Sequence, residues 1–392
     1  MRLNVGVIFG GKSVEHEISI ISAVEQMANL DDSKYKVIPI YIDKNNDWYT
    51  GMHLRDIIHY RDINLVKRYA KKVSLVKRDK SFILESQGFF KRNICVIDVV
   101  LPIGHGAFLE DGSLQGYLNM LGIPFVGSNV LASAIGQDKV IQKILLKANG
   151  VPICNYEWFY DFEFEKNRKD VLKRLSKLKY PLYVKPASLG SSIGISVVEK
   201  ESDLADNVKE ALKFDRKIIV EEKVPNVKEA NISVLGNYEK QSVSEIEEIN
   251  IDEDLYSFKE KYVEGYTKTK KKNSKTSPII SKEMISDMKT YAIDTFKILN
   301  ASGVARIDFL IDDKNKKIFV NEINTIPGDL SAYLWMAKKI TNKELLENLI
   351  DLAIQEQKKK DSLVYALPGN LLEGYDRLNG KKLKDIKEKE NN

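Results

Sequence analysis

Short apolar runs separated by turn residues occur along most of the chain and predict strands that alternate with helices. Near the N-terminus such runs occupy Val5–Phe9, Val37–Ile42 and Ile94–Ile103, and a helical pattern follows the first of them. Buried strands that alternate with helices are typical of an open α/β domain with a parallel sheet. We therefore expect residues 1–127 to form such a domain, with Ile94–Ile103 as one central strand.

The pattern after residue 128 predicts α+β structure, in which helices alternate with antiparallel strands. Lys139–Ala148 has apolar residues at helical spacing, and the expected buried side carries Val140, Ile141, Ile144, Leu145 and Ala148. Further helices are predicted at 202–213, 282–299 and 345–355. Strands are predicted at 182–185, 194–198, 217–221, 231–235 and 242–249.

Residues 303–328 predict a β-hairpin, because two apolar runs flank the polar segment 312–317. Asp308 lies in the first strand, and Glu322 and Asn324 lie near the end of the second. Alternate side chains share a face, so Glu322 and Asn324 point the same way, and strand pairing can add Asp308. Carboxylate and amide oxygens suit Mg²⁺. Solvated acids, or acids paired with the lysines of the hairpin, explain this spacing equally well.

Residues 6–13, GVIFGGKS, match the spacing of a P-loop, but Val7–Phe9 are apolar and must be strand rather than phosphate loop. What remains is a glycine turn that opens a helix, with Ser13 as N-cap and Glu15 and Glu17 in the first turn. Such a helix N-terminus can face an anion or a zwitterion. Compensation of the helix dipole is the simpler explanation for two glutamates there.

A lysine followed by small residues gives a more specific signal at 185–194, KPASLGSSIG. Gly190, Ser191 and Ser192 expose backbone N–H groups and hydroxyls without bulk, as phosphate binding requires. An ordinary hairpin loop is the alternative. His105 follows a predicted strand, at the end of the sheet where α/β proteins place ligands, although a single histidine there is more often structural.

Composition and charge exclude several classes of protein. The net charge is +5, and the lysine excess lies largely in 268–272, 358–360 and the C-terminal tail, which disfavours nucleic acid as a partner. No apolar run approaches the roughly 18 residues of a membrane span, and the N-terminus lacks the features of a signal peptide. Cys95 and Cys154 lack metal spacing and are expected to be free thiols, so we predict a cytoplasmic protein.

Taken together, these stretches resemble the D-alanine–D-alanine ligases of the ATP-grasp superfamily. They occur in family order and cover most of residues 3–330. The matching pieces are GGKSVEHEIS (10–19), HG..EDGSLQG (105–116), IPFVGS.VLASA...DK (123–139), VKPASLGSSIGIS (184–196), VEE (220–222), KE....VLGN (228–237), KEKY (259–262) and GVARIDF…NEINTIPG (303–328).

The resemblance implies an ATP-grasp fold behind the N-terminal domain. Residues 128–222 would be its central subdomain, 223–356 its C-terminal subdomain and 357–392 a lysine-rich tail. It also implies an ATP-dependent ligation of two D-amino acids, D-alanine above all, through an acyl phosphate. Two Mg²⁺ ions, replaceable by Mn²⁺, and a homodimer are expected on the same ground.

Roles for individual residues follow from the same resemblance. ATP would be bound by Lys139 and Lys185 at its phosphates, Glu221 and Val224 at adenine, Glu229 at ribose and Lys261 at the γ-phosphate. The catalytic set would be the hydrogen-bonded trio Glu15, Ser191 and Tyr262, with Arg306 and the Gly328 N–H as oxyanion donors. The metal ligands would be Asp308, Glu322 and Asn324, and the amino acids would meet His105, Tyr333 and Leu334.

Several positions depart from the family pattern, chiefly where the second amino acid is expected. Tyr333 stands where the family has a serine that meets the carboxylate of that substrate, and Trp335 is close by. Leu109 and Ser188 replace a usual glycine and a usual Asn or Arg, and residues 44–92 are longer than in compact members. A ligase for another second amino acid, a catalytically inactive nucleotide-binding homologue and a P-loop NTPase therefore stay open as alternatives.

Overall fold

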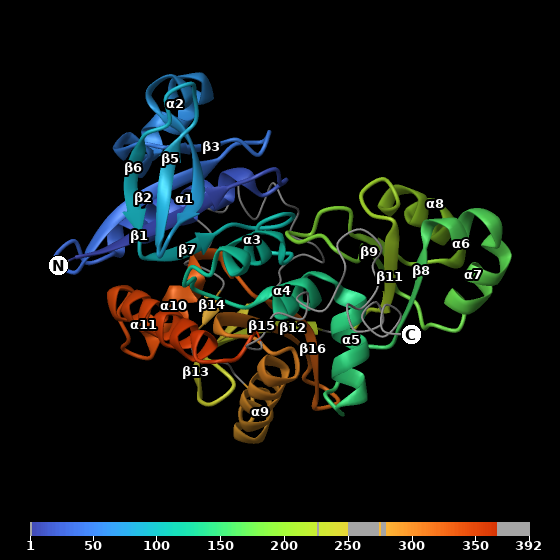
Figure 1. Ribbon diagram of the computed structural model, residues 1–392. Coiled ribbons are helices and arrows are strands. Elements are labelled where there is room, and N and C mark those ends of the chain that lie inside the picture. Colours follow the sequence, from blue (N-terminus) through green and yellow to red (C-terminus); the bar gives the residue numbers. More distant parts are fainter. Residues whose placement is uncertain (1, 226, 250–273, 276–279, 367–392) are drawn as a thin grey trace, which may run out of the picture.

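The computed structural model describes residues 2–225, 227–249, 274–275 and 280–366, and three sheets organise them (Figure 1). The first sheet lies in the N-terminal part and its strand order is β6-β5-β4-β3-β2-β1-β7. Its strands are β1 (Leu3–Gly10), β2 (Tyr35–Ile42), β3 (Trp48–Thr50), β4 (Lys71–Arg78), β5 (Ser81–Ser86), β6 (Asn93–Ile97) and β7 (Val99–Ile103). The helices of this part are α1 (His16–Asn29), η1 (Met52–Arg55), η2 (Ile57–Arg61), α2 (Ile63–Tyr69) and α3 (Ser113–Leu121).

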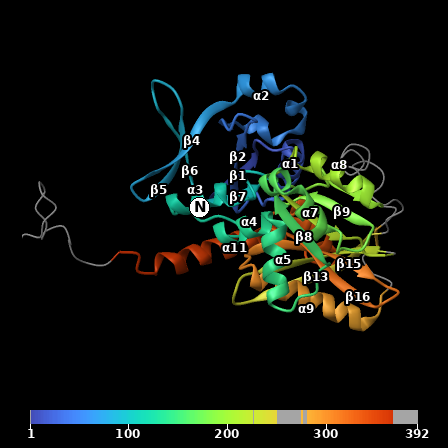
Figure 2. The same ribbon diagram turned by 90° about the vertical axis from the view of Figure 1, so that its right-hand side faces the viewer.

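This sheet is mixed, and only the strands β7, β1 and β2 are parallel. The prediction of one central strand at Ile94–Ile103 is wrong, because the chain changes partners at Asp98. Asp98 exchanges hydrogen bonds with the backbone of Asn4, which separates β6 from β7. The two strands end at opposite edges of the sheet. Residues 44–92 supply β3, β4 and β5, the antiparallel extension that stands away from the body in Figure 2.

The second sheet is antiparallel, with strand order β10-β9-β11-β8. Its strands are β8 (Tyr156–Tyr160), β9 (Leu182–Pro186), β10 (Ser196–Val198) and β11 (Lys217–Glu222). The helices of this region are α4 (Val130–Gln137), α5 (Lys139–Ala148), α6 (Asp161–Lys166), α7 (Arg168–Leu175) and α8 (Glu201–Ala211). Side chains from α6, α7 and α8 form one apolar core with the sheet.

Helix α5 has the predicted bounds, and Val140 of its predicted buried face is buried. Ile141 and Ile144 of that face, however, are 37% and 41% exposed, whereas Gln142 and Lys143 are each 1% exposed. The reason is that neighbouring strands supply partners for the polar side chains: Gln142 accepts from the Ile323 backbone, and Lys143 donates to a backbone carbonyl of the third sheet. The inner face of the helix therefore carries polar side chains as well as apolar ones.

The third sheet is antiparallel, with strand order β14-β13-β12-β15-β16, and it contains the predicted hairpin. Its strands are β12 (Val227–Gly236), β13 (Gln241–Ile249), β14 (Ser274–Lys275), β15 (Gly303–Asp312) and β16 (Lys317–Asn324). The long helix α9 (Lys282–Ile298) packs against this sheet, as the sequence predicts (Figure 1). The other face of this sheet carries polar side chains.

The chain returns to the first sheet after the hairpin, through η4 (Gly328–Ser331), α10 (Ala332–Ala337) and α11 (Asn342–Asp361). Trp335 and the apolar side of α11 share one core with β1, β7 and α1. This core joins the N-terminal sheet to the hairpin of β15 and β16. No described helix combines the length and apolar character that crossing a membrane requires.

The N-cap of α1 differs from the prediction by two residues. Helix α1 begins at His16 with Glu15 as N-cap, and the Ser13 hydroxyl accepts from the Glu15 N–H at 3.1 Å instead of capping the helix. The shift leaves the Glu15 side chain at the very start of α1, where it can reach other elements.

We expect Trp335→Ala to lower the apparent free energy of unfolding by about 3–5 kcal/mol. Trp335 is fully buried in the shared core, and its Nε1 donates to the Ser233 hydroxyl at 3.0 Å. Trp335→Phe keeps most of the apolar contact and is the control, with an expected loss of about half as much. Urea denaturation measures both variants. An alanine variant as stable as wild type would contradict this view of the core.

Candidate functional site

Strand register places a row of polar side chains across the third sheet. Glu322 of β16 pairs with Asp308 of β15, Asp308 with Asn231 of β12, and Asn231 with Glu247 of β13. The neighbouring row contains Arg306, which is in register with Asn324. Register alone reveals Asn231 and Glu247, because no sequence spacing links them to the hairpin.

Asp308 is the centre of this row. It accepts from Arg306 Nε and an Arg306 guanidinium nitrogen at 2.6 and 2.8 Å, and from Asn324 Nδ2 at 3.0 Å. The Asn231 amide nitrogen donates to Asp308 Oδ1, the oxygen that also accepts from Arg306 Nε, at 3.1 Å in the orientation that satisfies both the oxygen and the nitrogen of this amide. Burial raises the pKa of Asp308, and Arg306 opposes that shift. The ionised carboxylate of Asp308 therefore requires a neighbouring cation.

Glu322 faces lysines instead of arginine. Its carboxylate lies 3.1 Å from the Lys139 ammonium, which also donates to the Leu189 carbonyl at 2.8 Å. Burial opposes ionisation, but Lys139 and Lys185 outweigh it and lower the pKa of Glu322 to about 2. Glu322 is thus an anion near neutral pH, and Lys139 ties it to the 187–194 loop.

Glu221 is held by two lysines from different elements. Lys143 of α5 lies 2.8 Å from one carboxylate oxygen, and Lys185 of β9 lies 2.5 Å from the other. Burial opposes ionisation, but Lys143 and Lys185 together lower the pKa of Glu221 to about 2. The predicted phosphate lysine and the predicted adenine residue are therefore in direct contact. Lys143 was not singled out in the sequence, because its spacing reads as part of an ordinary helix face.

The 187–194 loop meets the start of α1. The Ser191 hydroxyl donates to the Glu15 carboxylate, so the structure brings two members of the predicted trio together. Ser191 and Ser192 adopt positive φ values of 54° and 60°, which aims successive groups of the loop toward α1. A Cβ at Gly190 would lie 3.3 Å from a Glu15 carboxylate oxygen, so a glycine permits the close approach. Tyr262, the third member, and Lys261 lie outside the described residues.

His105 and Glu110 lie on the other side of Glu15. Burial lowers the pKa of His105, and Glu15 opposes that shift. Burial and the nearby Glu15 raise the pKa of Glu110 to about 8. Glu110 accepts from the Gly106 N–H at 3.1 Å and from the Ile326 N–H at 3.3 Å, so it fastens the His–Gly loop to the end of the hairpin. Sequence reasoning quoted Glu110 in a motif without giving it a role.

The segment after the hairpin is unusual in its backbone. Asp329, Leu330 and Ser331 adopt positive φ values of 53°, 49° and 54° in succession, and Asp329 accepts from Gln26 of α1. The segment directs Tyr333 back to the polar row, where its hydroxyl donates to Glu247 at 2.7 Å. Tyr333, the residue that departs from the family pattern, is therefore paired with an acid of the polar row.

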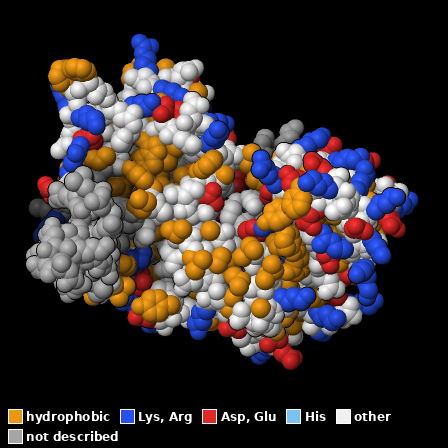
Figure 3. All heavy atoms as spheres, turned by 45° about the vertical axis from the view of Figure 1, so that its right-hand side comes forward, with side chains coloured by type: hydrophobic (Ala, Val, Ile, Leu, Met, Phe, Trp, Pro, Cys, Tyr) orange, Lys and Arg blue, Asp and Glu red, His pale blue; other side chains and the backbone are white. Residues whose placement is uncertain are grey.

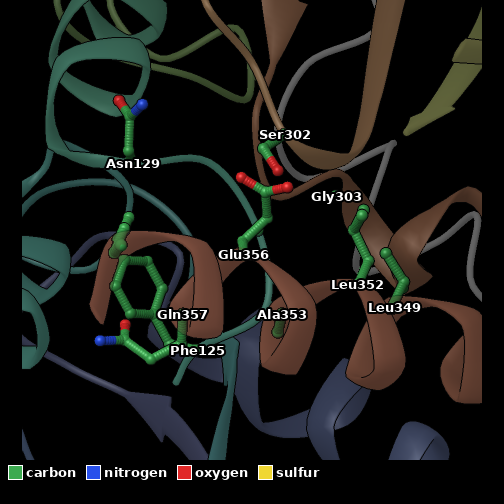
Figure 4. Close-up of a pocket in the computed structure, with 11 residues that line it drawn as sticks. Phe125, Asn129, Ser302, Gly303, Leu349, Leu352, Ala353, Glu356 and Gln357 are labelled. Carbon is green, nitrogen blue, oxygen red and sulfur yellow. The ribbon is translucent and has the colours of Figure 1, made fainter. Parts of the chain in front are cut away.

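The remaining predicted residues are placed as follows. Leu334 is fully buried, and Val224 is 6% exposed just after β11. Glu229 lies in β12 opposite Leu310, and Gly328 begins η4. A separate cavity lies between α11 and the turns at 127–129 and 302–303 (Figure 4), where Phe125 and Gln357 face each other. None of the predicted site residues lines that cavity.

Two family models match the chain. "D-ala D-ala ligase N-terminus" covers residues 4–128, and "D-ala D-ala ligase C-terminus" covers residues 145–351. A D-alanine–D-alanine ligase of Thermosipho melanesiensis is 40% identical over 372 residues, which span 94% of this chain and 98% of that relative. The chain belongs to the D-alanine–D-alanine ligase family.

Solved structures of the ligase family share the fold. The D-alanine–D-alanine ligase of Coxiella burnetii is 31% identical with a TM-score of 0.78, and the match covers 92% of this chain and 96% of that one. The VanG D-Ala:D-Ser ligase of Enterococcus faecalis is 30% identical with a TM-score of 0.76, covering 90% and 100%. A D-alanine–D-alanine ligase of Bacillus anthracis complexed with ATP is 25% identical with a TM-score of 0.65, covering 91% and 99%.

The donor set of the hairpin fits a hard divalent cation. Asp308 and Glu322 are in register on adjacent strands, and Asn324 adds an amide oxygen on the same face. Within the described ranges, no group of three His, Cys, Asp or Glu side chains forms a metal cluster. Oxygen donors without sulfur or imidazole suit Mg²⁺ or Mn²⁺ completed by substrate phosphate and water, and do not suit a zinc-type site.

The pair of lysines on Glu221 predicts a particular acid sensitivity. The folded pKa of Glu221, about 2, is below its ordinary value of 4.5, so its ion pairs stabilise the fold above that value. This contribution is lost as the pH falls from 4.5 toward 2.

We therefore expect Glu221→Gln, although less stable at neutral pH, to lose stability less steeply than wild type over this acid range. Denaturant midpoints measured at several pH values test this expectation. Identical acid slopes for variant and wild type would contradict it.

Proposed function

We propose that this chain is an ATP-dependent D-alanine–D-alanine ligase. It joins two D-alanine molecules through an acyl phosphate, releases ADP and phosphate, and supplies the dipeptide for peptidoglycan. The observation that carries the proposal is that cations gather at the carboxylates of the hairpin. Arg306 pairs with Asp308, and Lys139 pairs with Glu322. Lys185, which is paired with Glu221 of β11, adds its charge near Glu322. Full-length similarity to ligases of this name supports it.

The lysines and the hairpin serve the phosphoryl step in this proposal. Lys139 and Lys185 lie beside Glu322 and Glu221, from where each ammonium can turn to a phosphate oxygen. Phosphoryl transfer requires positioning and charge neutralisation more than covalent help. Asp308, Glu322 and Asn324 would hold Mg²⁺, which neutralises phosphate charge when it is bound. Val224 and Glu229 would contact adenine and ribose.

The first D-alanine would bind between α1 and the 187–194 loop. The Glu15 side chain is suited to the ammonium group of this substrate, and the Ser191 hydroxyl holds it in place. His105 is buried next to Glu15 and would line the same substrate. This arrangement directs the substrate carboxylate toward the γ-phosphate, so that a carboxylate oxygen attacks phosphorus and ADP leaves.

The second step forms the amide. The amine of the second D-alanine attacks the acyl carbon and forms the C–N bond. The bond from that carbon to the phosphate oxygen breaks, phosphate leaves with the electron pair, and the proton of the amine passes to the departing phosphate. Arg306 and the Gly328 N–H would stabilise the oxyanion of the tetrahedral adduct. Arg306 is fixed for this purpose by its two bonds to Asp308.

A second amino acid other than D-alanine is the alternative that one observation favours. Tyr333 contacts Glu247 where the family pattern has a serine. The VanG D-Ala:D-Ser ligase of Enterococcus faecalis matches this fold about as well as the Coxiella ligase does. Phosphate release with D-alanine alone, then with D-serine and other amino acids added, separates the two. Action in the cytoplasm, where ATP is available, and a homodimer belong to the same proposal.

Glu15→Gln is expected to reduce turnover by about 100-fold, roughly 2.7 kcal/mol, while ATP binding is retained. The amide keeps a hydrogen-bond acceptor for Ser191 but lacks the charge that the substrate ammonium requires. Steady-state phosphate release and equilibrium ATP binding measure the two effects.

Glu17→Gln is the matched control for this substitution, because Glu17 lies on the same helix with a 66% exposed side chain. We expect it to leave turnover within about two-fold of wild type. Normal turnover in Glu15→Gln, or an equal loss in both variants, would overturn the assignment of Glu15.

A further inference from the structure

Lys143 is a charged side chain that the proposed reaction does not use. It projects inward from α5, its side chain is 1% exposed, and its ammonium lies 2.8 Å from Glu221. The ammonium also donates to the Asn321 carbonyl of β16 at 3.2 Å. Lysines are almost never fully buried unless they are paired. Lys143 therefore links α5, β11 and β16 at a single buried point.

The two lysines on Glu221 differ in their surroundings. The Lys185 side chain is 10% exposed, ten times the fraction of Lys143. Lys185 also lies in the field of Glu322 on the hairpin and above the Tyr183 ring, with 5.2 Å between its ammonium and the ring centroid. Lys185 is thus at the edge of the nucleotide site, whereas Lys143 is enclosed behind Glu221.

The three side chains of this group carry one more positive charge than negative, and Glu322 is the next anion near Lys185. Lys143 and Lys185 carry two positive charges, and Glu221 carries one negative charge between them. A phosphate that attracts Lys185 leaves Glu221 with Lys143 as its only cation. Without Lys143, the same movement would leave a buried carboxylate unpaired, which is costly.

We propose that Lys143 is a positioning residue of the nucleotide site, the permanent counter-ion of Glu221 that leaves Lys185 free to bind phosphate. The inference rests on the proposed use of ATP and goes beyond it, because it concerns base selection. When Lys185 turns to phosphate, the Glu221 oxygen that it leaves can accept a hydrogen bond. The amino group of adenine donates to such an oxygen, whereas the carbonyl of guanine is repelled by it.

A matched control exists in the same two elements. Lys217 of β11 pairs with Asp138, the N-cap of α5, and its side chain is 11% exposed. Lys217 therefore also joins β11 to α5 through an ion pair, but no described contact joins it to Glu221. Loss of either lysine removes a link between strand and helix. Only loss of Lys143 removes the counter-ion of Glu221.

The test compares Lys143→Gln, Lys143→Arg and Lys217→Gln in the full-length enzyme. Lys143→Gln is expected to raise the KM for ATP and the Kd for ATP by about 10-fold or more, and to reduce the preference for ATP over GTP by a similar factor. The KM for D-alanine is expected to change by less than about two-fold. Lys143→Arg should restore most of the preference for ATP over GTP. Lys217→Gln should lower Tm without changing that preference.

The inference is overturned if Lys143→Gln folds, loses only thermal stability and keeps the wild-type Kd and ATP preference. If that variant does not fold, Glu221→Gln is compared with the double variant Lys143→Met/Glu221→Gln, in which neither side chain is charged. Removal of Lys143 from this background should cause no further loss of preference, and a further loss overturns the inference. Failure of the proposed function is a different result, in which the wild-type enzyme releases no ADP with D-alanine although nucleotide selectivity is still measurable by binding.

Discussion

The pairing of buried carboxylates with cations from other elements is the constraint on which the site depends. Glu221, Asp308 and Glu322 lie in strands of two different sheets, and each is held by lysine or arginine. A buried charge without a partner costs several kcal/mol, so these pairs fix how β9, β11, α5 and the hairpin lie relative to one another. The same cations are the groups that a triphosphate requires.

The ion pairs of the site are already formed in this structure, and a ligand can replace one partner of each pair. Lys139 is paired with Glu322, which would bind Mg²⁺, and Lys185 is paired with Glu221, which would bind adenine. Nucleotide and Mg²⁺ would therefore replace partners in ion pairs that are already formed. On the face drawn in Figure 3, lysine and arginine side chains are interspersed with acidic ones. The ion pairs between Glu221 and its two lysines, in contrast, are buried.

Much of the fold follows from the sequence, because its signals are local. Apolar periodicity and turn residues predicted the hairpin, the bounds of α5 and the strands before and after the 187–194 loop. The division at Asp98 did not, because it depends on a hydrogen bond to Asn4, which is 94 residues away. The buried face of α5 was missed for a related reason, since Lys143 is buried only because Glu221 is there to pair with it.

The candidate site shows the same division between local and long-range information. Motif order located Asp308, Glu322, Lys185 and Glu15, but Asn231 and Glu247 enter only through strand register. Tyr333 was visible as a departure from the family pattern, and its bond to Glu247 shows what the departure builds. The departure from the family pattern thus lies at Tyr333, and a pocket for a second substrate there stays a prediction.

The most direct measurement is the mass of the product formed from ATP, Mg²⁺ and a mixture of D- and L-amino acids, with ADP counted in parallel. The account predicts one dipeptide of two D-alanine residues for each ADP released. A mixed dipeptide with D-alanine only in the first position would move the assignment to the alternative second substrate. ADP release without any dipeptide, or no ADP release at all, would contradict the account.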